Sequence, residues 1–191
     1  HVIPAITIHD HLKENYDISI SSDVRGLKYL DDKFYKILVI DTPKLNNLIL
    51  FPLSILKVFF LVLKSLIILK KEKIRILIST GGYMSLPLCI AAWILNIKIY
   101  LLEPNMVIGR ANKFFLKFSK KIICYSENII NFPKKYKNKL NIINPLIRKK
   151  YYNKKSKENN NNKFTLIIIG GSQGAQIFDK ILHESIIKVS K

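Results

Sequence analysis

The sequence predicts an α/β fold built on a doubly wound, Rossmann-like parallel sheet. Three observations support this prediction. Short β-rich runs alternate with helical stretches, several of these runs are apolar throughout, and polar or glycine-rich turns follow some of them. Continuous apolar runs are typical of parallel strands that are buried on both faces. Strand–helix alternation of this length is typical of doubly wound sheets.

The elements are assigned in chain order from these patterns. The predicted strands are Ile18–Ser21, Lys36–Ile40, Arg75–Ser79, Ile97–Leu102, Lys121–Tyr125, Asn141–Ile143 and Thr165–Ile169. The predicted helices are Ala5–Glu14, Arg25–Tyr29, Leu48–Lys70, Met84–Leu95 and Arg110–Ser119. In the first helix Ala5, Ile8 and Leu12 share one face, and Pro4 suits a first helical turn.

A polar segment divides the chain. Residues 153–163 are rich in Lys and Asn and contain nothing that could enter a core, which predicts a surface linker. We therefore expect one domain over residues 1–152 and the start of a second over residues 164–191. The chain opens at a helix start without a strand before it and stops inside an apparent helix, so we expect it to be a fragment whose first strand is missing.

The charge balance is strongly basic. The 191 residues carry 32 Lys and Arg against 13 Asp and Glu, a formal net charge of +19. This excess favours an anionic partner such as acidic lipid, nucleic acid or a phosphate-bearing substrate. A compositional bias towards Lys, Asn and Ile would produce the same excess. Neither an RNA-binding aromatic motif nor a zinc spacing is present, so nucleic acid is not expected as a partner.

Three turns that follow predicted strands are candidate binding sites, because ligands bind outside the carboxyl ends of parallel strands. They are Thr80-Gly81-Gly82-Tyr83, Glu103-Pro104-Asn105 and Gly170-Gly171-Ser172-Gln173-Gly174-Ala175. The last turn runs from a buried strand into a helix start, where free N–H groups suit a phosphate or diphosphate. A tight turn without a ligand would show the same pattern. No metal or cofactor motif appears.

Three single residues are weaker candidates. Asn105 could hydrogen-bond a sugar or a base, or form an Asx turn. Arg148 follows Asn144-Pro145 and could pair with a phosphate, or be a solvated charge. His1 precedes a helix start, where a diphosphate could bind.

The run Leu48–Leu69 is strongly apolar and long enough to reach across a bilayer as a helix. Lys57 and Lys64 interrupt it on one helical face, at a cost of about 2.5–3.5 kcal/mol for each Lys near a bilayer centre. A helix that lies in the membrane interface avoids this cost. A buried core helix and a spanning helix are the alternatives.

Five motifs, in order along the chain, together resemble the MurG family of bacterial glycosyltransferases. The stretch His1-Val2-Ile3-Pro4-Ala5 resembles the end of the family's first glycine loop, Gly-Gly-His, and Thr80–Pro87 resembles GGYxSxP. Leu102–Asn105 with Gly109, Asn112 and Lys113 resembles HEQN…G..N[KR], Asn144–Arg148 resembles NPVR, and Gly170–Ala175 matches GGSQGA. The chain departs from these motifs at Leu102 and Pro104, and one extra residue separates Pro145 from Arg148.

The resemblance implies the N-terminal domain of a two-domain GT-B enzyme. Such an enzyme transfers N-acetylglucosamine from UDP-N-acetylglucosamine to N-acetylmuramyl-pentapeptide on undecaprenyl diphosphate, which converts lipid I to lipid II in peptidoglycan synthesis. It requires no metal and no cofactor. It is a peripheral protein on the cytoplasmic side of the bacterial inner membrane, and here Leu48–Leu69 and the flanking lysines are expected to face anionic lipid.

The resemblance also implies roles for residues. Asn105, Arg148 and Ser172 would contact the donor, and His1 is the candidate catalytic base or diphosphate contact. The loops would be supported by Gly81, Gly82, Tyr83, Glu103, Gly170, Gly171, Gln173 and Gly174. The alternative function is a non-catalytic membrane-anchoring or acceptor-binding subunit of a split glycosyltransferase.

Overall fold

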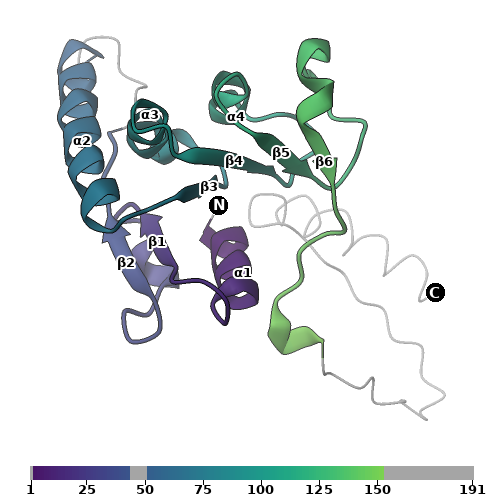
Figure 1. Cartoon of the computed structure of the whole chain (residues 1–191), viewed down its shortest axis with the longest axis horizontal. Helices are drawn as coiled ribbons and strands as arrows, with labels where there is room; N and C mark the ends of the chain where they lie inside the picture. The colour runs from purple at the N-terminus through teal and green to yellow at the C-terminus, as the bar shows by residue number, and fades with distance from the viewer. Residues whose placement is uncertain (1, 44–50, 153–191) are drawn as a thin grey trace, which may run out of the picture. The chain divides into compact units, whose positions relative to one another are not determined.

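Two parallel sheets form the framework of the described chain (Figure 1). The computed structural model describes residues 2–43 and 51–152. The chain divides into two compact units, His1–Lys154 and Lys155–Lys191, and all described residues belong to the first. Strands β1 (Ser19–Ser22) and β2 (Lys36–Val39) pair with each other, and β3 (Ile76–Ser79), β4 (Lys98–Glu103), β5 (Lys121–Cys124) and β6 (Leu140–Ile142) pair in that order. All of these pairs are parallel.

The described residues form four α-helices. They are α1 (Val2–Leu12), α2 (Phe51–Lys71), α3 (Leu86–Ile94) and α4 (Arg110–Phe115). Short 3-10 helices cover Leu27–Tyr29, Tyr83–Ser85, Lys134–Lys139 and Lys149–Tyr151. Helix α2 packs along α3, while α3 and α4 both contact β4. Helix α1 lies on the side of the larger sheet opposite to α3 and α4 (Figure 1).

Helices α2 and α3 end in the same way, in a Schellman motif. Lys73 and Asn96 follow the two helices with φ angles of 51° and 53°, in the left-handed region. The next residues bond back to the last turn: Ile74 N–H donates to Leu69 O at 3.0 Å, and Ile97 N–H donates to Ala92 O at 2.8 Å. Each reversal leads within a few residues into the next strand, β3 or β4.

The α/β architecture predicted from the sequence is therefore observed, and each described strand lies within one residue of its predicted bounds. The helices differ more at their ends. Residues 25–29 form only a 3-10 turn, and α4 stops at Phe115 rather than Ser119. The carbonyl oxygens that follow α4 are bound by a side chain instead, because Lys139 Nζ lies 2.7 Å from the oxygens of both Leu116 and Ser119.

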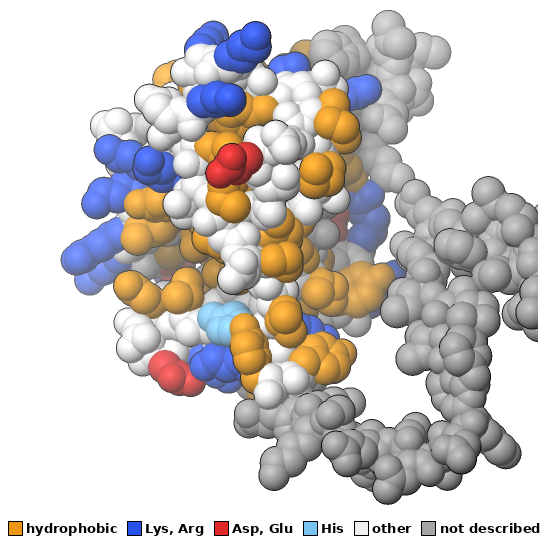
Figure 2. All heavy atoms as spheres, turned by 90° about the vertical axis from the view of Figure 1, so that its right-hand side faces the viewer, with side chains coloured by type: hydrophobic (Ala, Val, Ile, Leu, Met, Phe, Trp, Pro, Cys, Tyr) orange, Lys and Arg blue, Asp and Glu red, His pale blue; other side chains and the backbone are white. Residues whose placement is uncertain are grey.

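The core lies between the larger sheet and its helices. Ile99, Leu101 and Ile122 of the central strands are fully buried, together with Phe115 and Leu116 from the α4 region. The surface is basic, and on the face drawn in Figure 2 Lys and Arg side chains border a broad area of hydrophobic ones. Residues 153–191, which include the predicted linker and the strand Thr165–Ile169, lie outside the described part.

Helix α2 has two apolar faces. Val62, Ser65 and Leu69 are buried against the core, as a core helix would be. A second set of large apolar side chains is exposed: Ile55, Leu56, Phe59, Phe60, Leu63 and Ile67. Over the described residues no helix, α2 included, is long and apolar enough to cross a membrane.

Candidate functional site

Two of the predicted loops meet at the carboxyl edge of the larger sheet. Strand β3 ends at Ser79 and β4 ends at Glu103, and the two strands are parallel neighbours with Ser79 opposite Leu101. The loop after β3 carries Gly81, Gly82 and Tyr83, and the loop after β4 carries Asn105. This edge is where parallel sheets bind ligands, so the structure brings together the first two loops predicted from the sequence.

The first loop needs its glycines. Gly81 and Gly82 have φ angles of 84° and 83°, a region that residues with a Cβ adopt only at a cost. A Cβ on Gly81 would also lie 3.2 Å from Nδ2 of Asn112, 3.4 Å from its Oδ1 and 3.5 Å from its Cγ. Because these three distances are nearly equal, any side chain at position 81 would press on the flat face of the Asn112 amide.

The second loop is organised by the buried carboxylate of Glu103, which is 2% exposed. Its Oε1 accepts hydrogen bonds from Asn105, from the backbone N–H at 3.3 Å and from Nδ2 at 3.0 Å. Its Oε2 accepts the backbone N–H of Gly109 at 2.7 Å and Nδ2 of Asn112 at 3.0 Å. Four donors therefore compensate the burial of this carboxylate and fix residues 103–112 as one unit.

Tyr83 is covered by a neighbouring ion pair. The Arg25 guanidinium lies 5.2 Å from the centre of the Tyr83 ring, and Arg25 is itself paired with the buried carboxylate of Asp23. Asp23 also accepts the backbone N–H of Gly26 at 2.9 Å. This cation–π contact joins the turn after β1 to the glycine loop after β3. Sequence reasoning missed Asp23 and Arg25, because neither belongs to a motif with a recognisable spacing.

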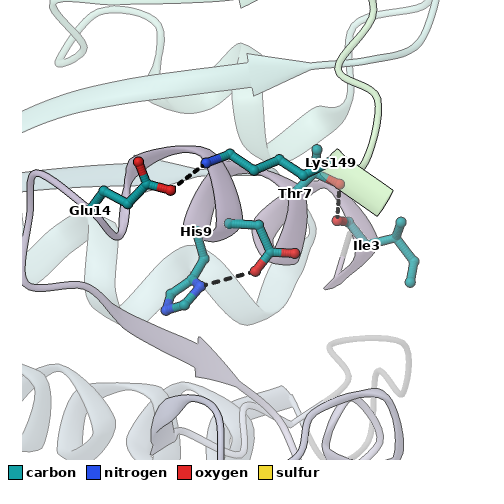
Figure 3. Close-up of polar contacts among 6 residues, drawn as sticks. Ile3, Thr7, His9, Glu14 and Lys149 are labelled. Carbon is teal, nitrogen blue, oxygen red and sulfur yellow. Dashed lines mark hydrogen bonds and ion pairs between the residues drawn. The ribbon is translucent and has the colours of Figure 1, made fainter. Parts of the chain in front are cut away.

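Arg148 lies elsewhere, on a segment whose next residue, Lys149, pairs with Glu14 just after α1 (Figure 3). The carbonyl oxygen of Ile147 accepts a hydrogen bond from His11 Nε2 at 2.9 Å. Lys149 Nζ pairs with Glu14 Oε1 at 2.8 Å. Burial raises the pKa of the nearby Tyr35 hydroxyl, and Asp10 adds to this rise while Arg148 opposes it. Among the described residues, Arg148 is therefore close to α1 and Tyr35 and is not brought together with Asn105.

A hollow of about 300 Å³ lies beside this segment. It is lined by His9, Asp10, Lys13, Phe34, Tyr35 and Lys149. His9 is nearly buried, with Nδ1 3.4 Å from Asp10 Oδ1 (Figure 3) and its ring edge-on to Tyr35. The hollow is separate from the pair of loops at the carboxyl edge.

Six predicted site residues lie outside the described residues. They are His1, Gly170, Gly171, Ser172, Gln173 and Gly174. Their roles remain predictions. In the described ranges no cluster of three or more His, Cys, Asp or Glu side chains could hold a metal ion.

The two cysteines are buried and are not poised as nucleophiles. Burial raises the pKa of the Cys89 thiol to about 11, and hydrogen bonds with Ser79 and Ser85 oppose this rise. Burial, with the negative charge of Glu103, raises the pKa of Cys124 to about 12. Both thiols are therefore protonated at neutral pH.

The family follows from the N-terminal two thirds of the chain. The model of the glycosyltransferase family 28 N-terminal domain matches residues 1–124, which include both loops at the carboxyl edge. The chain belongs to this family. The Glu103 network lies within the matched domain.

Curated relatives show which members of the family this chain resembles. The UDP-N-acetylglucosamine–N-acetylmuramyl-(pentapeptide) pyrophosphoryl-undecaprenol N-acetylglucosamine transferase of Pelagibacter ubique is 50% identical over 192 residues, which cover all of this chain and 54% of the relative. The protein of the same name from Rickettsia canadensis is 33% identical over 190 residues, covering 97% of this chain and 53% of the relative. The chain spans about half the length of the curated relatives it matches, and its resemblance to the MurG family is confirmed.

A solved structure confirms the fold. The crystal structure of Acinetobacter baumannii MurG superimposes with a TM-score of 0.64 at 22% sequence identity. The match covers 78% of this family 28 chain and 43% of the MurG chain. The Rossmann-like architecture predicted from the sequence is that of the MurG N-terminal domain.

Proposed function

We propose that the protein to which this chain belongs transfers N-acetylglucosamine from UDP-N-acetylglucosamine to undecaprenyl-diphosphate-linked N-acetylmuramyl-pentapeptide in peptidoglycan synthesis. The 50% identity to the Pelagibacter transferase over the whole chain carries this proposal. The chain supplies the acceptor- and membrane-facing domain, residues 1–152. Residues 164–191 begin the nucleotide-sugar domain after a linker at 153–163.

Substrate binding is shared between the two loops at the carboxyl edge and residues outside the described part of the chain. Asn105 is held by the Glu103 carboxylate at the carboxyl edge, in reach of a sugar bound there. Ser172, with Gly170, Gly171, Gln173 and Gly174, is expected to bind the diphosphate group of the donor. His1 acts at the acceptor as base or diphosphate contact. The donor contact expected of Arg148 stays a prediction, because Arg148 lies beside Tyr35 and not beside Asn105. No metal or other cofactor takes part.

The exposed apolar face of α2, defined as Ile55, Leu56, Phe59, Phe60, Leu63 and Ile67, contacts the membrane. An acceptor carried on a long lipid is met at the bilayer surface, where apolar side chains bind in the interface. Lys57 and Lys64 lie along the edge of this face, and Lys70 and Lys71 lie at its end, in position to attract acidic headgroups. The protein is accordingly peripheral, on the cytoplasmic side of the inner membrane.

A hybrid protein tests the activity. The stretch of the Pelagibacter ubique relative that aligns with this chain is replaced by residues 1–191, so that the relative supplies the remaining 46%. The hybrid should transfer N-acetylglucosamine from UDP-N-acetylglucosamine to the lipid-linked acceptor. The matched negative control is the hybrid with Asn105→Ala, which should raise the donor KM.

A folded hybrid that turns over neither substrate would overturn the proposed function. Activity with another sugar nucleotide in place of UDP-N-acetylglucosamine would overturn the donor assignment alone. Circular dichroism of the hybrid beside the unmodified relative establishes that both are folded.

A further inference from the structure

Asn112 connects the two loops of the site although it belongs to neither. It lies in α4 and is 2% exposed. Its Nδ2 donates to Leu102 O at 3.1 Å and to Glu103 Oε2 at 3.0 Å. Because both neighbours are acceptors, the orientation of the amide is fixed and cannot be reversed.

The rest of the amide faces the glycine loop. Its flat face lies opposite the position that a Cβ at Gly81 would occupy, within 3.2–3.5 Å of it. Its Oδ1 is buried and has no hydrogen-bond partner among the described residues. An unpaired buried amide oxygen costs free energy, so Oδ1 does not hold Asn112 in place. Its position is set by the two hydrogen bonds that Nδ2 donates and by the packing of its amide face opposite Gly81.

We propose that Asn112 is the positioning residue of the site. It holds the Glu103 carboxylate, and through Glu103 it sets the orientation of Asn105, while its amide face sets the distance of the Gly81-Gly82 loop from that carboxylate. It acts on the donor sugar through Asn105 and does not itself touch substrate. This inference rests on the proposed function, in which Asn105 contacts the donor.

Replacing one amide group by a carboxylate tests the link. Asn112→Asp keeps the shape of the side chain but removes both donated hydrogen bonds and places a second carboxylate beside Glu103. In the hybrid protein, the donor KM should rise about tenfold or more, with the acceptor KM and kcat changed by less than about threefold. The matched control is Asn128→Asp, the same change at an exposed residue, which should leave all three constants unaltered.

A readout independent of turnover follows the held backbone. The Gly109 amide donates to Glu103 Oε2 at 2.7 Å, so in Asn112→Asp its hydrogen exchange should accelerate, as should that of residues 80–83. A merely structural role would instead lower kcat with the fraction of folded protein and leave the donor KM unchanged.

Coupling between Asn112 and Gly81 gives the second arm. Gly81→Ala introduces a Cβ that presses on the Asn112 amide, in addition to the strain of its positive φ. The strain is the same in any background, whereas the contact disappears in Asn112→Ala. The double variant should therefore lose less than the product of the two single losses in kcat/KM for the donor.

The outcomes separate the two proposals. An inactive unsubstituted hybrid contradicts the proposed function, and in that case normal exchange at Gly109 in Asn112→Asp would also overturn the positioning role. An active hybrid whose Asn112→Asp variant keeps its donor KM, or multiplicative effects of Gly81→Ala and Asn112→Ala, would overturn the positioning role alone.

Discussion

Single buried groups decide how the carboxyl edge is built. Glu103 is only 2% exposed, yet each of its carboxylate oxygens accepts a hydrogen bond. The turn that follows β4 folds the backbone N–H groups of Asn105 and Gly109 back onto the carboxylate. The sequence placed Glu103 and Asn105 in a binding loop, and the structure puts them in direct contact. The sequence also placed Asn112 in the same motif but assigned it no role, since a spacing of nine residues along the chain does not reveal that the side chains of Glu103 and Asn112 meet.

Because the pKa of the Cys89 thiol is raised in the folded chain, the free energy of unfolding should fall at alkaline pH. This pKa is raised to about 11 in the folded chain from an ordinary value of 9.0, so the folded state retains its proton after the unfolded chain has lost its own. The stability is thus fully present below pH 9 and declines between pH 9 and pH 11, by up to about 2–3 kcal/mol for this group.

Urea unfolding of the chain at pH 8 and pH 10.5, with and without Cys89→Ala, isolates that group. The variant should lose less free energy of unfolding between the two pH values than the parent does. Equal losses in both proteins would show that Cys89 does not contribute. Alkylation of Cys89 by iodoacetamide should be slow at pH 8 in the folded chain, because the thiol is buried and protonated.

At the scale of one element, α2 carries apolar side chains on both its buried and its exposed face. The apolar composition predicted a helix, and it left core, interface and spanning positions open. The three-dimensional arrangement separates the faces, since Val62, Ser65 and Leu69 face the core while Phe59 and Phe60 are more than half exposed. Sequence alone could not make this separation, because both faces consist of the same residue types.

Replacing Phe59 and Phe60 by Ser distinguishes the two faces. Both side chains are exposed, so the double variant should unfold within a few degrees of the parent, while it should bind anionic liposomes less well. The matched control is Val62→Ser at a buried position of the same helix, which should lower the melting temperature markedly. Liposome sedimentation beside thermal melting makes the measurement, and undiminished sedimentation of the Phe59/Phe60 variant would exclude this face as the lipid contact.

At the scale of the whole molecule, the alternation of strands and helices predicted the parallel architecture and placed the described strands within one residue. Hydrophobic pattern predicts such elements well because buried strands admit few polar residues. The position of Arg148 was not predictable, because its segment follows the last strand and its location depends on contacts with α1 at the other end of the chain. A motif gives the type of a residue, while only the tertiary contacts give its neighbours.

The extent of the chain predicts that it is inactive by itself. It spans about half of its curated relatives, and residues 1–152 are expected to form one of two domains that enclose the donor. The purified chain should show no transfer from UDP-N-acetylglucosamine under conditions in which the hybrid protein is active. Turnover by residues 1–191 alone, measured by release of UDP, would show that the domain assignment is wrong.

The left-handed residues that end α2 and α3 cost some stability, which a substitution at these positions could restore. Both Lys73 and Asn96 occupy left-handed positions, yet Asn tolerates this conformation far better than Lys does. Lys73→Gly should therefore raise the free energy of unfolding by about 0.5–1 kcal/mol, and Asn96→Gly by less, in parallel urea titrations. The junction from α2 into β3 is thus a natural first position for engineering a more robust form of this domain, because it lies at the amino end of β3, opposite the carboxyl end from which the glycine loop starts.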